Sequence, residues 1–282
     1  MRPNERSFTL VYILGAGHCG STLLSLLLNA HSRMLGLSEI QIIHRYASRA
    51  PGDGRENLLT TPFWQEVKKC YESDSDGLFA DIDISSPSAK RALSYPPEEC
   101  AEWAAPTLDL LGCIARESAA DILVDSSKFL SRCFLLKRSG LFDLRVIHLI
   151  RDGRAVINSY ARKYDNFRIG FRRWMLPSLA AFYLRHTSKP SHWLRIRYED
   201  LATRPAANLR RICSYLGIEF EPGMLAYRKQ PYYGIGGNRM AKGHDQEISL
   251  DTRWRQELPL AYRIKFSLLA GWLNRYYGYG YF

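Results

Sequence analysis

A run of small residues between an apolar stretch and a leucine-rich stretch is the feature that most limits how this chain can fold. The run is GAGHCGST, Gly15 to Thr22, preceded by apolar residues over 8–14 and followed by LLSLLLNAH. This pattern predicts a buried strand, a glycine turn and the start of a helix. A helix N-terminus after such a turn directs backbone N–H groups and the positive end of the helix dipole at an anion. The loop therefore predicts a site for a phosphate-like group.

The loop is not a complete nucleotide triphosphate motif. Walker A requires Gly, four residues, then Gly-Lys-Ser/Thr, and Ser21 stands at the lysine position after Gly20. His18 supplies a basic side chain inside the loop instead. The same residues also match the dinucleotide fingerprint GxGxxG, with Glu39 near the position of a ribose-binding acid. A P-loop kinase or NTPase and an NAD(P)-binding Rossmann oxidoreductase thus stay open as alternatives at this point.

Apolar runs alternate with helical patterns along the chain, which is typical of a mainly parallel sheet flanked by helices. We expect a single α/β domain, P-loop-NTPase-like, with a central, mostly parallel sheet of about five strands. The expected strands are 8–14, 33–37, 121–124, 144–150 and 192–196. The expected helices are 20–30, 97–119, 127–138, 153–163, 171–186, 205–216 and 260–276. Residues 51–62, 72–77 and 230–243 are expected to be loops, the last one mobile enough to cover a bound nucleotide.

Composition narrows the class of protein. No stretch of the 282 residues approaches 18 uncharged apolar residues, so we expect no membrane span and no signal peptide. Six scattered cysteines without CxxC spacing predict free thiols in a reducing cytoplasm, with neither zinc nor a disulfide. The net charge is +11, and residues 128–213 hold 19 Lys and Arg against 5 Asp and Glu, which suits an anionic ligand. No nucleic-acid recognition motif is visible, so we expect no nucleic-acid partner.

A second polar region lies between Val124 and Tyr164. One expected strand runs into Asp125-Ser126-Ser127-Lys128, and the next runs into Arg151-Asp152, with Ser159 eight residues after the arginine. In an open α/β sheet, ligands bind at the carboxyl ends of the strands, so both clusters are expected to face the same crevice as the glycine loop. An arginine fork and a hydroxyl suit a second phosphate. Asp125 or Ser126 is also expected to cap the following helix.

Taken together, these segments resemble the sulfotransferases that use 3′-phosphoadenosine 5′-phosphosulfate (PAPS). GAGHCGSTLL is similar to their 5′-phosphosulfate loop, and IRDGRAVINSY is similar to their 3′-phosphate motif, including the spacing from Arg to Ser. RYEDL and the late segments GNRM and DTRWRQEL also resemble the family. The likeness runs from about residue 8 to the end. Residues 50–115 match no motif and are expected to form a variable, mainly helical insertion near the acceptor site of one domain that spans 1–282.

The resemblance implies roles for the matched positions. The loop would hold the 5′-phosphosulfate, and the late segments would contribute to the nucleotide lid. Lys128 resembles the lysine that some members use near the transferred group, while His18 occupies a slot where the family usually carries Lys or Arg, which leaves its charge open. The implied donor-binding residues are Gly17, His18, Cys19, Gly20, Ser21, Thr22, Arg151, Ser159, Arg239, Arg253 and Arg255.

The acceptor must lose a proton during transfer. The cytosolic branch of the family uses a His for this step, and the tyrosylprotein and Golgi-type branches use a Glu. The stretch LNAHSRMLGLSEI resembles the second arrangement, so Glu39 is the expected general base. His31 and His44 are alternatives, and His148 lies in an apolar strand that favours a core histidine. Glu39, Lys128 and His18 are therefore the expected catalytic residues.

The resulting functional hypothesis is in-line transfer of a sulfuryl group from PAPS to a hydroxyl or amine of a small-molecule, glycan or peptide acceptor. Adenosine 3′,5′-bisphosphate would be the product nucleotide. We expect no metal, because no carboxylate cluster of the kind that binds Mg²⁺ stands out. A non-catalytic nucleotide- or glycan-binding module is a further alternative. Aromatic residues that could line an acceptor pocket are Tyr46, Trp64, Trp103, Phe171 and Trp174.

Overall fold

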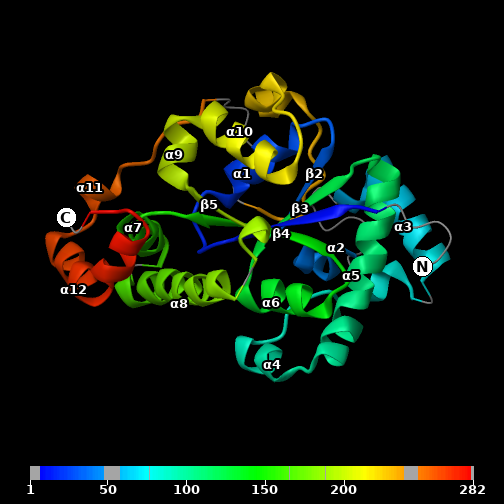
Figure 1. The fold of residues 1–282 in the computed structure, drawn as a ribbon, viewed down its shortest axis with the longest axis horizontal. Coiled ribbons are helices and arrows are strands. Elements are labelled where there is room, and N and C mark those ends of the chain that lie inside the picture. The colour runs from blue at the N-terminus through cyan, green and yellow to red at the C-terminus, as the bar shows by residue number, and fades with distance from the viewer. Residues whose placement is uncertain are drawn as a thin grey trace. The chain divides into compact units, whose positions relative to one another are not determined.

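A computed structural model provides the structure of the chain, and it describes residues 7–47, 58–75, 77–164, 166–187, 189–237 and 247–280. Its described strands form one five-stranded sheet in the order β2-β3-β1-β4-β5 (Figure 1). The strands are β1 (Thr9–Leu14), β2 (Met34–Ser38), β3 (Ile122–Lys128), β4 (Asp143–Ile150) and β5 (Trp193–Arg197). β2 and β3 run parallel, with Met34 opposite Ile122. The predicted fold class, a parallel α/β sheet with flanking helices, is confirmed.

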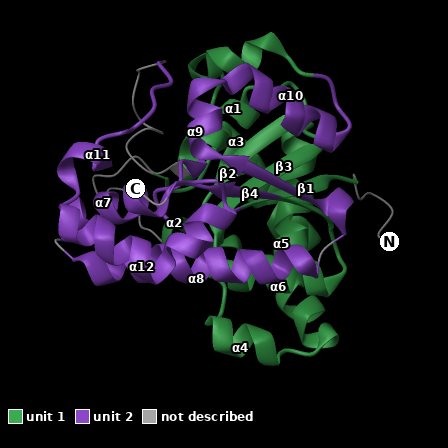
Figure 2. Ribbon diagram, turned by 60° about the vertical axis from the view of Figure 1, so that its left-hand side comes forward, with its two compact units in different colours: residues 1–13, 22–146, 220–246 green, residues 14–21, 147–219, 247–282 purple. Residues whose placement is uncertain are grey.

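The chain divides into two compact units (Figure 2). Unit 1 comprises 1–13, 22–146 and 220–246, and unit 2 comprises 14–21, 147–219 and 247–282. The longer helices of unit 1 are α1 (Ser21–Asn29, whose first residue is in unit 2), α3 (Pro62–Asp74), α5 (Pro97–Ser118) and α6 (Leu130–Ser139), and the short ones are α2 (His44–Ala47) and α4 (Ala89–Ser94). Those of unit 2 are α7 (Gly153–Tyr164), α8 (Phe167–His186), α9 (Tyr198–Thr203), α10 (Pro205–Leu216), α11 (Trp254–Glu257) and α12 (Leu260–Tyr276).

Local sequence explains where several helices begin and end. Pro97 opens α5, followed by two glutamates in its first turn, and this order suits the unpaired N–H groups and the helix dipole. Asn166 caps α8 because its side-chain oxygen accepts hydrogen bonds from two backbone N–H groups of the first turn. Gly140 and Gly217 end α6 and α10 in the left-handed conformation. No helix within the described ranges has the length and apolar character needed to cross a membrane.

The prediction of free cysteines is wrong for one pair. Cys70 on α3 and Cys113 on α5 form a disulfide across 43 positions of sequence, while Cys19, Cys100, Cys133 and Cys213 are free and buried. Spacing gave no sign of this bond, because two helices bring the residues together. The cytoplasmic location was inferred from free thiols and therefore loses that support.

The structure also corrects the prediction that Asp125 or Ser126 caps the helix after the third expected strand. β3 continues through Lys128, and Phe129 occupies the cap position of α6 without a side-chain cap. Asp125 therefore does not cap the helix. Its carboxylate instead accepts hydrogen bonds from the backbone N–H of Ser127 and from Arg132 Nε at 2.8 Å, and both members of the ion pair are fully buried. Because a buried charge must be paired, this contact lets the strand carry a buried carboxylate, and β3 continues to Lys128 although its pairing with β2 is irregular between Gly36 and Ser38.

Two predicted loops contain regular or packed structure. Glu72–Asp74 belong to the last turn of α3. The described part of the 230–243 segment enters the core of unit 1, where fully buried Ile235 forms a parallel bridge with Ser38. Residues 238–246, with the GNRM motif and Arg239, lie outside the described residues, as do 48–57 of the first predicted loop.

Candidate functional site

The glycine loop connects β1 to α1 and packs closely against aromatic side chains of unit 2. A Cβ atom on Gly17 would lie 2.2 Å from Tyr160 Oη, and one on Gly20 would lie 2.4 Å from the ring of Tyr198. Gly20 also has a φ of +95°, which side chains rarely adopt. Glycine at these two positions therefore lets the loop backbone approach α7 and α9.

His18 has an unusual backbone conformation for a residue with a side chain. Its φ is +61°, and its exposed ring stands edge-on to Tyr160 of α7 with the ring centres 4.6 Å apart. Non-glycine residues in this region are uncommon and gather at functional sites. The imidazole therefore lies at the surface of the loop rather than in the core.

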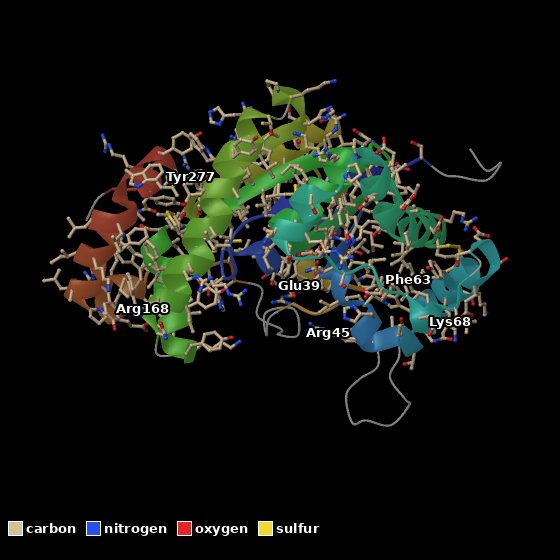
Figure 3. The ribbon with its side chains drawn as sticks, turned by 90° about the horizontal axis from the view of Figure 1, so that it is seen from below. Glu39, Arg45, Phe63, Lys68, Arg168 and Tyr277 are labelled. Carbon is tan, nitrogen blue, oxygen red and sulfur yellow. A yellow bond between two sulfur atoms is a disulfide. The ribbon has the colours of Figure 1, made fainter. Side chains whose placement is uncertain are left out.

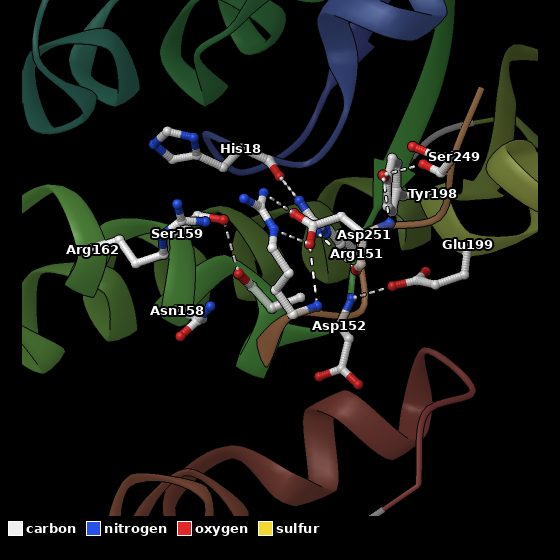
Figure 4. Close-up of polar contacts among 12 residues, drawn as sticks. His18, Arg151, Asp152, Asn158, Ser159, Arg162, Tyr198, Glu199, Ser249 and Asp251 are labelled. Carbon is white, nitrogen blue, oxygen red and sulfur yellow. Dashed lines mark hydrogen bonds and ion pairs between the residues drawn. The ribbon is translucent and has the colours of Figure 1, made fainter. Parts of the chain in front are cut away.

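Arg151 joins the second predicted motif to this loop. It follows β4 directly, its side chain is 7% exposed, and its Nη1 donates a 2.9 Å hydrogen bond to the carbonyl oxygen of His18 (Figure 4). Its guanidinium also stacks 4.4 Å from the ring centre of Tyr198. Two segments 133 positions apart thus meet within unit 2, as the sequence predicted for the glycine loop and the Arg151 motif.

The guanidinium of Arg151 binds an anionic side chain of the same unit. Its Nη2 lies 3.1 Å from Oδ2 of Asp251, whose two carboxylate oxygens also accept hydrogen bonds from Arg253 at 2.8 and 2.9 Å. These hydrogen bonds, from Arg253 first and then Arg151, hold the pKa of Asp251 well below its usual value although partial burial opposes the shift. Arg253 was predicted at this site, and Asp251 was not.

A buried network fixes the turn between β4 and α7. Asp152 accepts hydrogen bonds from the backbone N–H of Arg154 and from its guanidinium, and so caps α7. The backbone N–H of Asp152 donates to Glu199 of the RYEDL motif, and Glu199 accepts a 2.6 Å bond from Tyr279. RYEDL therefore supports the Arg151 turn from outside, a role that the sequence did not reveal.

Ser159 lies on α7, two turns after Arg151. Its half-buried hydroxyl donates to the carbonyl of Ala155 at 3.0 Å, within the helix. Figure 4 shows Ser159 and His18 on the same side of the Arg151 cluster. The hydroxyl can rotate, so its present donor bond leaves the oxygen able to accept or donate toward a ligand.

Arg255 stacks against an aromatic ring of the same segment. Its guanidinium carbon lies 5.4 Å from the centre of the Trp254 ring, and that of buried Arg154 lies 4.4 Å from it. Trp254 is therefore held by two arginines, and Arg255 itself is exposed. Within the RWR sequence, Arg255 therefore stacks on Trp254, whereas Arg253 binds Asp251.

Unit 1 carries the other predicted catalytic residues, and they form a pair. Lys128 Nζ donates a 2.5 Å hydrogen bond to Glu39 Oε1 and a 3.1 Å bond to the carbonyl of Ser126. The Glu39 side chain is 30% exposed and that of Lys128 17% exposed; Glu39 is labelled in Figure 3. Lys128 has a φ of +70°, and Ser38, directly before Glu39, has a φ of +54°. The backbone is thus strained on both sides of the pair.

Residues near Glu39 include one that the sequence analysis missed. The backbone N–H of Glu39 donates to the carbonyl of Ile235, which brings Tyr232 beside the pair, where its hydroxyl lies 3.1 Å from Ser25 Oγ. Burial raises the pKa of Tyr232, and the nearby charge of Glu39 adds to the shift. Tyr232 therefore stays protonated near neutrality. Tyr232 lies in the sequence QPYYG, which predicted only an irregular loop.

The predicted histidine alternatives do not gather around Glu39 in this way. His31 is buried and lies 3.6 Å from Glu221, and His44 lies 3.8 Å from Asp83. His148 is 2% exposed, and burial, with a smaller effect of the Arg195 charge, lowers its pKa to about 3. His148 is a neutral core residue, as predicted.

The described residues offer a single cluster with metal-ligand composition, formed by Cys70, Asp74 and Cys113 in unit 1. The two sulfurs of this cluster are joined in the disulfide, and Arg116 Nη2 lies 2.6 Å from Cys70 Sγ. A guanidinium against the sulfurs repels a cation, so we assign no metal to this cluster.

Parallel strands followed by a glycine loop at a helix N-terminus define the P-loop-like class of α/β proteins. Within that class, residues 11–222 match the family model described as the sulfotransferase family. This match covers most of the chain, so the chain belongs to the sulfotransferase family.

Known proteins agree with this assignment. Human carbohydrate sulfotransferase 6 is 27% identical over 147 residues, which are 42% of this chain and 37% of that protein. The sulfotransferase domain of the Synechococcus PCC 7002 olefin synthase superposes with a TM-score of 0.63 at 22% identity, covering 99% of this chain and 98% of the domain. A sulfotransferase domain from the curacin biosynthetic pathway gives 0.58 at 20% identity, covering 95% and 98%. At these identities the two structures support the fold.

Proposed function

We propose that this protein is a PAPS-dependent sulfotransferase that moves a sulfuryl group to a hydroxyl or amine of its acceptor. The observation that carries the proposal is the hydrogen bond from Arg151 Nη1 to the carbonyl of His18. Through it, the segment that resembles a 3′-phosphate motif meets the loop that resembles a 5′-phosphosulfate site. A nucleotide phosphorylated at both positions is the ligand class that suits two such elements together.

The residues of unit 2 fit such a nucleotide. Arg151 Nε is buried and has no hydrogen-bond partner among the described residues, so one donor of this guanidinium is unused there. The same group already binds the carboxylate of Asp251, which supports its suitability for an anionic oxygen. Gly17 and Gly20 have no room for a Cβ, and the loop backbone is therefore the part that would face a phosphate.

The proposed donor contacts follow from these positions. Gly17, His18, Cys19, Gly20, Ser21 and Thr22 would hold the 5′-phosphosulfate, Arg151 and Ser159 the 3′-phosphate, and Arg239, Arg253 and Arg255 would contribute to the lid. PAPS would supply an activated sulfuryl group. His18, exposed at the loop, would stabilise charge on the leaving phosphate. No metal is included in the proposal.

Glu39 and Lys128 would serve the acceptor side. A bond forms between the acceptor oxygen or nitrogen and sulfur, the bond from sulfur to the phosphate oxygen breaks, and the acceptor proton passes to Glu39. The hydrogen bond from Lys128 to Glu39 Oε1 orients the carboxylate and leaves Oε2 without that contact. Lys128 would also stabilise negative charge near the transferred group.

The acceptor class is proposed as a small molecule, a glycan or a peptide. The human relative is named for carbohydrate sulfation, and the bacterial structures are domains of biosynthetic systems. We expect the 50–115 insertion, which contains α3 and α4 and most of α5, to contribute to acceptor choice. A nucleotide kinase or NAD(P) enzyme is disfavoured by Ser21 at the Walker lysine position and by the contact of Glu39 with Lys128.

An assay of sulfuryl transfer tests the proposed function. The protein is incubated with PAPS and panels of sugars, phenols, amines and peptides, and products are sought that are heavier by one sulfuryl group. Appearance of such a product together with adenosine 3′,5′-bisphosphate is expected. Turnover of ATP or NAD in its place would refute the proposed donor, and tight PAPS binding without any product across the panels would favour a binding module.

A further inference from the structure

Unit 2 contains a cavity of about 390 Å³ that plays no part in the proposed reaction. It lies between the C-terminal ends of α8 and α12, the strand β5 and the helix α10. Three arginines line it, Arg185, Arg195 and Arg211, and no carboxylate does. The volume is in the range of pockets that hold small molecules.

No carboxylate of the described residues pairs with the three arginines. Among the residues that the structure describes, none of these guanidinium groups forms an ion pair, and the polar contact of Arg211 is a 3.4 Å bond to Asn208 Oδ1. Other arginines of the unit, such as Arg151 and Arg154, do bind carboxylates. Three like charges around one cavity repel each other, and an anion between them would remove that cost.

The rest of the wall is aromatic. Phe182, Trp193, Tyr276 and Tyr277 line the same cavity, and Arg195 lies 5.6 and 5.8 Å from the ring centres of the two tyrosines. Tyr277, labelled in Figure 3, is fixed by a 2.7 Å hydrogen bond from its hydroxyl to the carbonyl of Ser178. Rings of this kind bind the flat or apolar face of a ligand while the arginines bind its charge.

The floor of the cavity adds no negative charge. His148 of β4 lies there between Trp193 and Tyr277, with ring centres 5.7 and 5.3 Å away, and it is neutral. Basic residues at a helix C-terminus can simply complement the helix dipole, which would account for Arg185. That explanation does not apply to Arg195 on β5 or to Arg211, seven positions into α10.

We propose that this cavity, here called the arginine cavity, binds a phosphate or sulfate monoester of a ring compound. The three arginines would hold the ester group, and the aromatic walls would contact the sugar or base. The site is separate from the donor contacts proposed above, and it does not depend on them. Glucose 6-phosphate, glucose 6-sulfate and AMP represent the two esters and the two kinds of ring.

Calorimetric titration tests the arginine cavity with these three probes, in protein saturated with adenosine 3′,5′-bisphosphate. We expect at least one probe to bind, and an Arg195→Ala/Arg211→Ala variant to weaken it at least about 10-fold. Both side chains are exposed, so the fold should tolerate the change. Arg172→Ala, an exposed arginine of α8 that does not line the cavity, is the matched control.

Each result of the titration either supports or overturns the proposal. Binding that is lost in the double variant and kept in Arg172→Ala supports the arginine cavity, and the preferred probe identifies the ester and ring. If no probe binds more tightly than about 10 mM, or if Arg172→Ala causes an equal loss, the proposal is overturned. Affinity for adenosine 3′,5′-bisphosphate, measured in the same variants, reports on the proposed function separately. Should the double variant be unstable, Arg185→Ala provides the same comparison.

Discussion

The two regions proposed for donor and acceptor chemistry are built in different ways. Arg151 in unit 2 is held by His18, Tyr198 and Asp251, and the turn that carries it is fixed by Glu199. The pair of Glu39 and Lys128 in unit 1 rests on one direct hydrogen bond and strained backbone. A rigid anion site suits binding, whereas a carboxylate with one fixed oxygen suits proton transfer.

The largest effect is expected from Glu39→Gln, which keeps the shape of the side chain and removes the base. We expect kcat to fall by about 10²- to 10⁴-fold, the usual contribution of general base catalysis. The affinity for adenosine 3′,5′-bisphosphate should stay within about two-fold, because Glu39 is not among the proposed donor contacts. Steady-state kinetics with any acceptor found in the screen measure this. A loss within a few-fold would mean that another group, with His31 or His44 to be tried next, takes the proton.

The second-largest effect is expected from Lys128→Ala. It removes the cation beside Glu39, and we expect kcat to fall by about 100-fold with little change in donor affinity. Lys90→Ala, an exposed lysine of α4, serves as the control for loss of charge. Equal rates for both variants, or a defect in donor affinity alone, would remove Lys128 from the chemistry.

Arg151→Ala examines the other region. The affinity for adenosine 3′,5′-bisphosphate should fall by about 30-fold, equivalent to about 2 kcal/mol for charge-assisted hydrogen bonds. Adenosine 5′-phosphosulfate, which lacks the 3′-phosphate, should be affected far less. Arg145→Ala, in the strand β4 that precedes Arg151, provides the control. If both nucleotides lose affinity equally, Arg151 only maintains the loop through His18.

The last prediction concerns the stability of the protein under acid conditions. Burial lowers the pKa of His148 from 6.5 to about 3, so between these pH values the unfolded chain takes up a proton that the folded chain does not. Stability should therefore decrease as pH falls from about 6.5 toward 3, by at most about 1.4 kcal/mol per pH unit from this residue. Chemical denaturation of His148→Phe should show a shallower slope, while His186→Gln, an exposed histidine, should keep the wild-type slope. Identical slopes in all three proteins would contradict this.

Much of the fold followed from local pattern, and the failures have physical causes. β1, β4 and α10 were found within a residue of their ends, because apolar periodicity and the residues at helix ends are local signals. α3 was not predicted, since it lies in a stretch rich in polar residues. β3 was ended too early because the burial of Asp125 depends on Arg132, a contact that pattern alone does not reveal.

The residues of the candidate site likewise divide into those that the sequence predicted and those that it did not. Motif resemblance predicted Arg151, the glycine loop and Arg253, because each lies in a short segment with recognisable residues. Tyr198 and Asp251 lie in the segments RYEDL and DTRWRQEL, but their contacts with Arg151 were not predicted, since they join segments far apart in sequence. Tyr232 lies in no recognised motif. Likewise, Glu39 and Lys128 were each expected near the reaction, but their direct contact across 89 positions required coordinates.

The most direct test of a nucleotide site built from Arg151 and the glycine loop is a calorimetric comparison of two ligands with the wild-type protein. Adenosine 3′,5′-bisphosphate and AMP differ by the 3′-phosphate alone. The account predicts that the bisphosphate binds at least about 30-fold more tightly, the contribution assigned to Arg151. Equal affinities for the two nucleotides would contradict it.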